Sequence, residues 1–289
     1  MLSTVKAVAT NTRIAKAYRL WRDQRKFAKR TYKPCSLGFQ FYGHSQMQEG
    51  SFENNEIQIA KPLMKCSDVF LDIGANVGYY TCLACHEGCK AVLAIEPLQD
   101  NLKYLCGNIS ANEWENRVEV WPVGVSSYPS IATIYSEGTG ASLIKGWAGS
   151  SELMHQTIPV NTIDNLMAGR FDNEQIFVKI DIEGVEYTAL QGGKSLLSRR
   201  IKPRWLVEIT LSEHRKGAVN EHFVDTFNLF LREGYLCYSV SDGLVAISQH
   251  DVEMYASGQE DSRFRTNFLF ISESDSEAYS WIRPSIKVA

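Results

Sequence analysis

Long apolar runs are absent from this sequence, which contains no stretch of 18 apolar residues that could form a membrane-spanning helix. The opening residues, MLSTVKAVAT, hold only a short apolar segment and lack the core of a signal peptide. No internal repeat is evident along the chain. These absences predict a cytoplasmic protein, with any membrane contact confined to the bilayer surface.

A disulfide framework is also not expected. The cysteines are odd in number and no secretory signal accompanies them. We interpret them as reduced thiols, several of them buried as small apolar side chains. They are Cys35, Cys66, Cys82, Cys85, Cys89, Cys106 and Cys237.

Charge is distributed unevenly over an ordinary composition of 289 residues, 44% of them hydrophobic and 22% charged. Residues 1–34 carry ten Lys or Arg side chains and a single acid, Asp23, although the whole chain has a net charge of −3. A basic arm therefore precedes an acidic body, and the body is not expected to bind nucleic acid. We divide the chain into a basic helical arm (1–45), a main domain (46–272) and a loosely held polar tail (273–289).

The basic arm has the spacing of an amphipathic helix, with Tyr18 and Trp21 among the apolar residues of one face. Three interpretations stay open. The arm could lie on a membrane surface, it could be a solvated helix that packs on the body or on a partner subunit, or it could be a mitochondrial transit peptide. The sequence predicts no oligomeric state.

Strand-like and helix-like segments alternate from residue 69 onward. The apolar strand segments are VFLDI (69–73), AVLAI (91–95), VEVWPV (118–123), QIFVKIDI (175–182) and PRWLVEIT (203–210). Helical segments are expected over 77–87, 98–110, 185–199 and 219–232. This alternation predicts an α/β fold with a mostly parallel sheet covered on both faces. The segments GYLCYSV, GLVAIS and TNFLFIS follow with little helix between them and predict antiparallel strands that close the sheet edge.

The segment FLDIGANVGYYTCLACHEGC (70–89) contains three overlapping patterns. DIGANVG resembles a nucleotide-binding turn, and CLACH matches the attachment pattern of a c-type haem. The candidate zinc ligands are Cys82, Cys85, His86 and Cys89. On one short helix packed against a sheet these side chains lie in a line and cannot surround a zinc ion. We therefore expect buried thiols rather than haem or zinc.

The turn itself selects between cofactors. Asp72 would repel the phosphate of a dinucleotide or ATP but attract the cationic groups of S-adenosylmethionine (AdoMet). Gly74 and Gly78 permit a tight turn and close approach of a ligand, and no Lys-Ser or Lys-Thr pair follows them, which excludes a P-loop. Glu96 ends the second strand, where an acid can accept hydrogen bonds from the ribose of either NAD or AdoMet. Asp72 together with Asn76, which replaces the middle glycine of the dinucleotide motif, favours AdoMet.

A second group of acids, Asp181, Glu183 and Glu186, lies at and after the end of the strand QIFVKIDI. We expect it at the same sheet edge as Asp72 and Glu96. The dipole of the following helix explains Glu183 and Glu186 near its N-terminus. It explains Asp181, which is still on the strand, less well. Burying carboxylates near the end of an apolar strand lowers stability unless they are paired with other groups or take part in binding or catalysis.

Together these motifs resemble those of FkbM-type AdoMet-dependent methyltransferases. The resemblance is carried by FLDIGANVGYYT, AIEPLQDNLKYLCGNI, GASL, VNTIDNL, VKIDIEGVEYTALQGG and WLVEI, over about residues 50–271. It implies a class I methyltransferase (Rossmann-like) fold and an acceptor hydroxyl on a sugar, a glycan or a related natural product. The implied cofactor contacts are Asp72, Gly74, Asn76, Gly78, Glu96, Asn101, Ser142 and Asp181. It also implies that Asp181, Glu183 and Glu208 line the reaction site.

The predicted reaction places the acceptor oxygen about 3 Å from the transferred methyl carbon. Because an alcohol is a weak nucleophile, we expect Asp181 or Glu183 to take up or orient its proton. Glu208 and His214 are second candidates, although His214 is also explained as a surface loop residue. A divalent cation held by these acids is an alternative. An NAD-dependent oxidoreductase and a non-catalytic Rossmann-like binding module also stay open.

Overall fold

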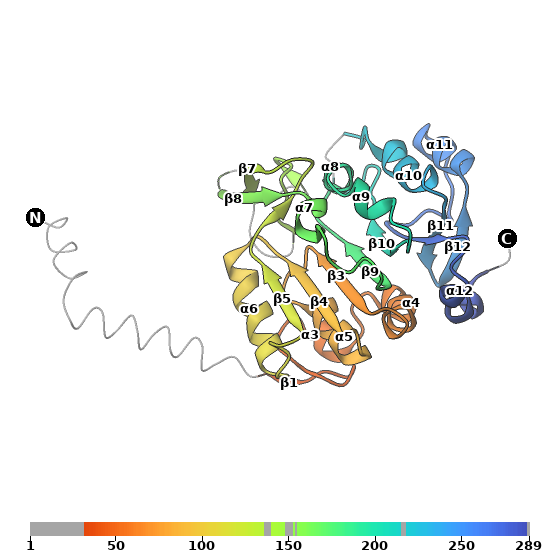
Figure 1. The fold of residues 1–289 in the computed structure, drawn as a ribbon. Helices are drawn as coiled ribbons and strands as arrows, with labels where there is room; N and C mark the ends of the chain where they lie inside the picture. Colours follow the sequence, from red (N-terminus) through yellow and green to blue (C-terminus); the bar gives the residue numbers. More distant parts are fainter. Residues whose placement is uncertain (1–31, 136–139, 148–152, 154, 215–217, 288–289) are drawn as a thin grey trace, which may run out of the picture.

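The computed structural model describes residues 32–135, 140–147, 153, 155–214 and 218–287 (Figure 1). Of the predicted basic helical arm (1–45), residues 1–31 lie outside the described residues. For the described remainder the prediction of a helix is wrong, because residues 32–44 contain two short strands, Lys33–Pro34 and Gln40–Phe41, which pair with each other.

An eight-stranded sheet forms the centre of the described domain, in the order β12-β11-β13-β10-β9-β3-β4-β5. Its parallel strands are β3 (Val69–Ile73), β4 (Ala91–Ile95), β5 (Val118–Trp121), β9 (Ile176–Ile180) and β10 (Arg204–Glu208). Antiparallel pairing then adds β11 (Tyr235–Ser241), β12 (Gly243–Ile247) and β13 (Asn267–Ser272) at one edge. The predicted Rossmann-like α/β fold, with antiparallel strands from the C-terminal part, is confirmed.

Helices cover both faces of this sheet, which explains why its central strands are apolar along their whole length (Figure 1). One face carries α3 (Ser45–Glu49), α4 (Asn54–Lys65), α5 (Tyr79–Glu87), α6 (Gln99–Ser110) and α12 (Ser276–Ile282). The other carries α7 (Ile163–Met167), α8 (Glu186–Gln191), α9 (Lys194–Leu197), α10 (Phe223–Leu231) and α11 (Gln249–Ala256). Successive strand residues alternate between the two cores, so Phe70 faces α5 and Leu71 faces the opposite layer.

The cysteines of α5 and of the segment just after it are buried as predicted. Cys82, Cys85 and Cys89 are free thiols with at most 2% of their surface exposed. His86 differs, because it is exposed and its ring lies beside that of Phe39. Among the residues that the structure describes, no group of three or more His, Cys, Asp or Glu side chains is arranged to hold a metal ion.

A small second sheet was not predicted. It consists of β6 (Gly124–Val125), β8 (His155–Asn161) and β7 (Ser130–Tyr135), in that order. Its two longer strands are exposed or half-buried at most positions and bury only a few apolar side chains, among them Ile134 and Ile158. Because so few positions are buried, the alternating pattern that marks a strand is weak in the sequence.

Both ends of the described chain pack on the domain. Strands β1 (Lys33–Pro34) and β2 (Gln40–Phe41) pair with each other, and Phe41 is fully buried. The expectation of a loosely held tail is wrong for α12, because its residues Ala278 and Ile282 are fully buried. The short 3₁₀ helix η3 (Arg283–Ser285) that follows α12 has no buried residue.

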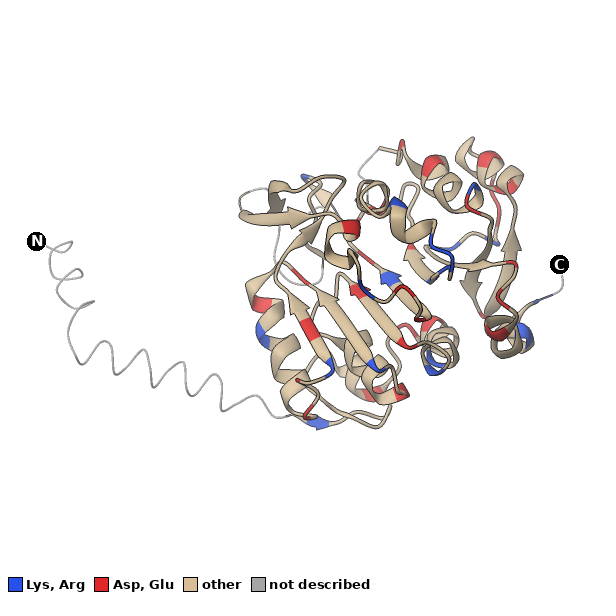
Figure 2. Ribbon diagram, viewed as in Figure 1, with Lys and Arg blue, Asp and Glu red and all other residues tan. Residues whose placement is uncertain are grey.

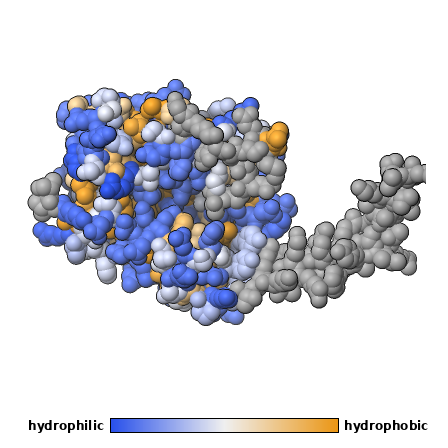
Figure 3. Space-filling model, turned by 180° about the vertical axis from the view of Figure 1, so that it is seen from behind, coloured by the Kyte–Doolittle hydropathy of each residue, from blue (hydrophilic) through white to orange (hydrophobic). Residues whose placement is uncertain are grey.

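The surface of the described domain is mixed in charge. Figure 2 shows Lys or Arg and Asp or Glu side by side on α4 and α6. The face seen in Figure 3 is mostly hydrophilic, with small separate hydrophobic patches. Within the described ranges, no helix is long and apolar enough to cross a membrane.

Candidate functional site

Most of the predicted site residues, among them Asp72, Glu96 and Asp181, gather at the carboxyl ends of the parallel strands, where open α/β sheets bind ligands. Two adjoining pockets lie there. The first extends from the ends of β3 and β4 to the small sheet, and the second extends toward α3, α5 and the end of β10. Gly74, Asn76, Asp181 and Glu183 line both pockets, which therefore meet at these four residues.

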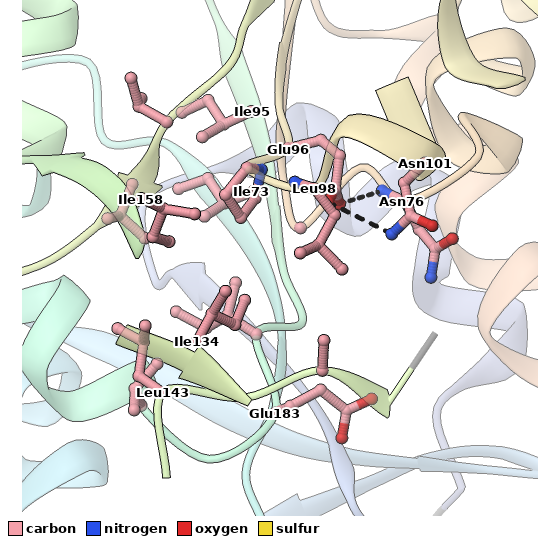
Figure 4. Close-up of a pocket in the computed structure, with 18 of the residues that line it drawn as sticks. Ile73, Asn76, Ile95, Glu96, Leu98, Asn101, Ile134, Leu143, Ile158 and Glu183 are labelled. Carbon is pink, nitrogen blue, oxygen red and sulfur yellow. Dashed lines mark hydrogen bonds between the residues drawn. The ribbon is translucent and has the colours of Figure 1, made fainter. Parts of the chain in front are cut away.

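Glu96 is the polar anchor of the first pocket (Figure 4). Its buried carboxylate accepts hydrogen bonds from the backbone N–H groups of Asn76 (2.9 Å) and Leu98 (2.8 Å) and from Nδ2 of Asn101 (3.2 Å). Burial raises the pKa of Glu96 to about 7, although the hydrogen bonds from Leu98 and Asn76 lower it. Since a carboxylate accepts about four hydrogen bonds, the three donors fix its position and leave room for a ligand hydroxyl.

Apolar side chains form the walls of the first pocket. Ile73 and Ile95 end two of the central strands, and Ile134, Leu143 and Ile158 come from the small sheet and its connecting segment. Figure 4 shows Ile134 and Leu143 across the cavity from Glu96. An apolar slot with a carboxylate at one end is suited to a nucleoside, with the base between the walls and the ribose at the acid.

Glycine is required at one point of the turn that joins the two pockets. Gly74 has a φ of 86°, and a Cβ there would lie 1.9 Å from the backbone oxygen of Asp181. Glycine therefore lets the turn after β3 approach the end of β9. Gly78 has a different role, because it precedes α5 and a Cβ there would lie 2.5 Å from Leu105. Gly78 is outside the described lining of both pockets.

Asn76 offers an unsatisfied acceptor at the junction of the pockets. Its backbone N–H is bonded to Glu96, but its side-chain Oδ1 is buried and has no hydrogen-bond partner among the described residues. An unpaired buried polar atom is unfavourable by about 1–3 kcal/mol. This oxygen fits an ammonium or hydroxyl donor of a bound cofactor such as AdoMet.

A buried lysine lines the second pocket. Lys179 of β9 is 4% exposed, and its Nζ lies 2.7 Å from Oδ2 of Asp181 and 4.6 Å from the centre of the Tyr80 ring. The Tyr80 hydroxyl in turn donates to Oε2 of Glu53 (2.6 Å). Burial alone would lower the pKa of Lys179, but the charges of Asp181, Glu53 and Asp72 hold it above its ordinary value. Lys179 is therefore a permanent cation among carboxyl groups.

Asp181 and Glu208 form a carboxyl pair beside this lysine. Burial would raise the pKa of Asp181, but the charge of Lys179 and a hydrogen bond with Glu208 hold it below its ordinary value. Burial and the charge of Asp181 raise the pKa of Glu208. The two carboxyl groups therefore titrate as a pair, in which Asp181 favours the ionised form and Glu208 favours the protonated form.

Asp72 belongs to the second pocket rather than the first. It is 2% exposed, and its Oδ2 accepts a hydrogen bond from the Thr81 hydroxyl (2.6 Å). Burial raises the pKa of Asp72 to about 6, although the hydrogen bond from Thr81 and the charge of Lys179 lower it. Asp72 is thus a buried acid on the far side of the turn from Glu96.

Glu183 lies in a loop held in a strained conformation. It is a non-glycine residue with a φ of 59°, which is unfavourable by about 1–3 kcal/mol. Its Oε2 accepts from Nε1 of Trp147 (2.6 Å), and its backbone oxygen accepts from the Ser142 hydroxyl (2.6 Å). The buried carboxylate of Glu186 accepts from the backbone N–H of Gly184 (2.9 Å). Burial raises the pKa of Glu183.

The remaining predicted residues fall in different places. Asn101 lines the first pocket, and Glu208 and His214 line the second. His214 is an exposed loop residue whose ring centre lies 5.8 Å from that of Trp147. Ser142 lies outside the described lining of both pockets and acts through its hydrogen bond to the Glu183 loop.

Four residues at the site were not predicted from the sequence: Lys179, Glu53, Tyr80 and Trp147. Lys179 was detectable, because a lysine within the fully buried strand IFVKI requires a charged partner. Glu53 and Trp147 come from segments far from Asp181 in the sequence, and no local pattern marks them.

A family model for the methyltransferase FkbM domain matches residues 72–237 of this chain. The search of curated proteins found no match.

Several solved structures are similar to the chain at low identity. The methyltransferase FkbM from Methylobacillus flagellatus KT is 20% identical with a TM-score of 0.45, over 71% of this chain and 44% of that one. The O-methyltransferase from Bacillus cereus in complex with SAH is 11% identical with a TM-score of 0.40, over 93% and 98%. The precorrin-6y C5,15-methyltransferase from Geobacter metallireducens GS-15 is 10% identical with a TM-score of 0.40, over 80% and 91%. The chain thus spans less than half the length of the M. flagellatus protein.

Proposed function

The chain belongs to the FkbM methyltransferase family, and we propose that it transfers a methyl group from AdoMet to a hydroxyl of a sugar, a glycan or a related natural product. One observation carries this proposal. Asp181 and Glu183 line both pockets, so a cofactor in the first pocket and an acceptor in the second would meet beside two carboxyl groups. We assign this activity to the main domain (46–272).

The first pocket would hold the cofactor. AdoMet, when bound, supplies the activated methyl group. Glu96 would accept hydrogen bonds from the ribose hydroxyls, while Ile134 and Leu143 would enclose the adenine. The free Oδ1 of Asn76 would accept a further hydrogen bond at the junction of the pockets.

The second pocket would hold the acceptor and take up its proton. Glu183 is the better proton acceptor of the two shared acids, because burial raises its pKa whereas that of Asp181 is held low. Asp181, fixed by Lys179, would orient the hydroxyl. Glu208 is a less suitable base, because its raised pKa favours the protonated form, and His214 lies at the exposed side of the pocket.

The cofactor assignment is tested by calorimetry with AdoMet, its demethylated product SAH, and NAD. We expect AdoMet and SAH to bind and NAD not to bind. Binding of NAD alone would overturn the proposal, and binding of none of the three would favour a non-catalytic module.

The acid assignments are tested by measuring SAH release with a panel of uncharged hydroxyl compounds, including one-ring and two-ring glycosides. Glu183→Gln should slow transfer by about 10²–10⁴-fold, the usual contribution of a positioned base. Asp181→Asn should also slow it. Glu119→Gln, at an exposed residue paired with Arg170, serves as the control. If both site variants keep full transfer rates, the assignment is wrong. A parallel assay with EDTA tests the alternative of a divalent cation.

A further inference from the structure

The second pocket continues into an open groove. The groove is lined by Tyr42, Gly43, His44, Val77 and Tyr104. His44 and Val77 also line the second pocket, so the two spaces are contiguous. The groove shares no described lining residue with the first pocket. It therefore extends the acceptor side of the site and not the cofactor side.

The groove walls are held in place by a buried amide. Asn108 of α6 is fully buried; its Oδ1 accepts from the backbone N–H of Tyr42 (2.7 Å), and its Nδ2 donates to the backbone oxygen of Val77 (2.8 Å). One turn later, Asn112 exchanges hydrogen bonds with the backbone of Gln40 (2.8 and 2.7 Å). These bonds fix the segment after β2 relative to the turn after β3. A ligand in the groove would meet a preformed surface, which lowers the entropy lost on binding.

The chemistry of the groove favours an uncharged ring. The rings of Tyr42 and Tyr104 are parallel, with centres 5.4 Å apart, and both side chains are partly exposed. Its described lining contains no Asp, Glu, Lys or Arg. Tyrosine and histidine offer an apolar body with a polar tip, which matches a sugar ring with C–H groups on its faces and hydroxyls at its edge. A charged group would find no Asp, Glu, Lys or Arg partner in this described lining.

We propose that the groove is a second acceptor subsite, which binds the ring next to the one that carries the reacting hydroxyl. The acceptor would then be an uncharged glycoside of at least two rings. This inference rests on the proposed function, because the reacting ring is assigned to the second pocket.

The test compares matched probes in the SAH-release assay: methyl glucoside with methyl maltoside, and methyl mannoside with methyl mannobioside. We expect the KM of a two-ring acceptor to be at least about tenfold below that of its one-ring partner, equivalent to about 1.4 kcal/mol. Tyr104→Ala should raise the KM of the two-ring probe to that of the one-ring probe. Tyr128→Ala removes a tyrosine that is 64% exposed outside the described groove lining and should leave the difference intact.

The outcomes separate the two proposals. Transfer with equal KM for one-ring and two-ring probes, or an equal rise for both in Tyr104→Ala, would overturn the subsite but not the methyl-transfer function. If SAH binds and no probe is methylated, the assigned acceptor class fails. Ligand-observed NMR with the SAH-loaded protein then decides on the groove. Binding of a two-ring probe that is abolished by Tyr104→Ala would support the second subsite in the groove. Absence of such binding would overturn the subsite.

Discussion

At the scale of single residues, Glu96 is predicted to control cofactor affinity. Glu96→Gln keeps the shape of the side chain but removes its charge and can place an NH₂ group against the N–H donors of Asn76 and Leu98. Hydrogen bonds to charged groups contribute about 1.5–3 kcal/mol, so we expect SAH to bind about 10- to 100-fold more weakly in calorimetry. Unchanged affinity would show that the ribose does not lie at Glu96.

Some of the site residues could be predicted from the sequence and others could not. Asp72, Gly74 and Glu96 were found because they sit at fixed distances from strand ends, where the fold places ligands. The pairing of Lys179 with Asp181 was missed although it was detectable, because residues two apart along a strand lie on the same face of the sheet. Asp72 was predicted as a cofactor contact. Its side chain lines the second pocket and is outside the described lining of the first, so a cofactor contact at Asp72 stays a prediction.

At the scale of elements, the loop before α8 depends on glycine. Gly184 has a φ of 95°, and a Cβ there would lie 2.3 Å from the Trp147 ring. Gly184→Ala should therefore displace Trp147 from Glu183 and reduce the rate of methyl transfer at least about tenfold. The backbone strain of an alanine in this left-handed conformation, about 1–2 kcal/mol, is a separate effect on stability. Gly234→Ala is the matched control, because Gly234 has a φ of 78° and no atom within 4 Å of an added Cβ. Equal losses of transfer in both variants would contradict a specific role for the loop.

Elements also differ in how well they could be predicted. Strands β3, β4, β9 and β10 are buried on both faces and read as continuous apolar runs, which makes them detectable from local sequence alone. The region 185–199 was expected as one helix but forms α8 and α9, which Gly192 and Gly193 separate. Helix α12 was missed because its stability depends on a partner distant in sequence, Arg204 of β10.

That partner gives a prediction for α12. Asp275 caps the helix by accepting from the backbone N–H of Ala278 (2.9 Å) and pairs with the buried Arg204 through two hydrogen bonds. Asp275→Ala should lower the free energy of unfolding by about 3–5 kcal/mol, because it leaves a buried charge without its main partner. Glu277→Gln, at a side chain 60% exposed, should lower it by less than about 1 kcal/mol. Urea denaturation measures both, and similar values would contradict the role assigned to Asp275.

At the scale of the whole molecule, the site acids make folding stability depend on pH. Burial raises the pKa of Asp72 to about 6 and those of Glu96 and Glu186 to about 7, whereas the unfolded chain has values of about 4. Each folded carboxyl group therefore keeps its proton to higher pH than the unfolded one. The stabilisation is fully present below pH about 4 and is lost as pH rises toward 7, by up to about 1.4 kcal/mol per pH unit and group.

The free energy of unfolding should accordingly fall between pH 5 and pH 7.5 in urea titrations. Glu186→Gln should reduce that slope, because it removes one group while its amide oxygen can still accept from the N–H of Gly184. Asp261→Asn should leave the slope unchanged in this window, since the hydrogen bonds from Arg263 lower the pKa of Asp261 and move its titration below pH 4. A rise in the free energy of unfolding over the same range would mean that the acids of the site are ionised in the folded protein and are stabilised by more than the contacts described above. An unaltered slope in Glu186→Gln would mean the same for Glu186 alone.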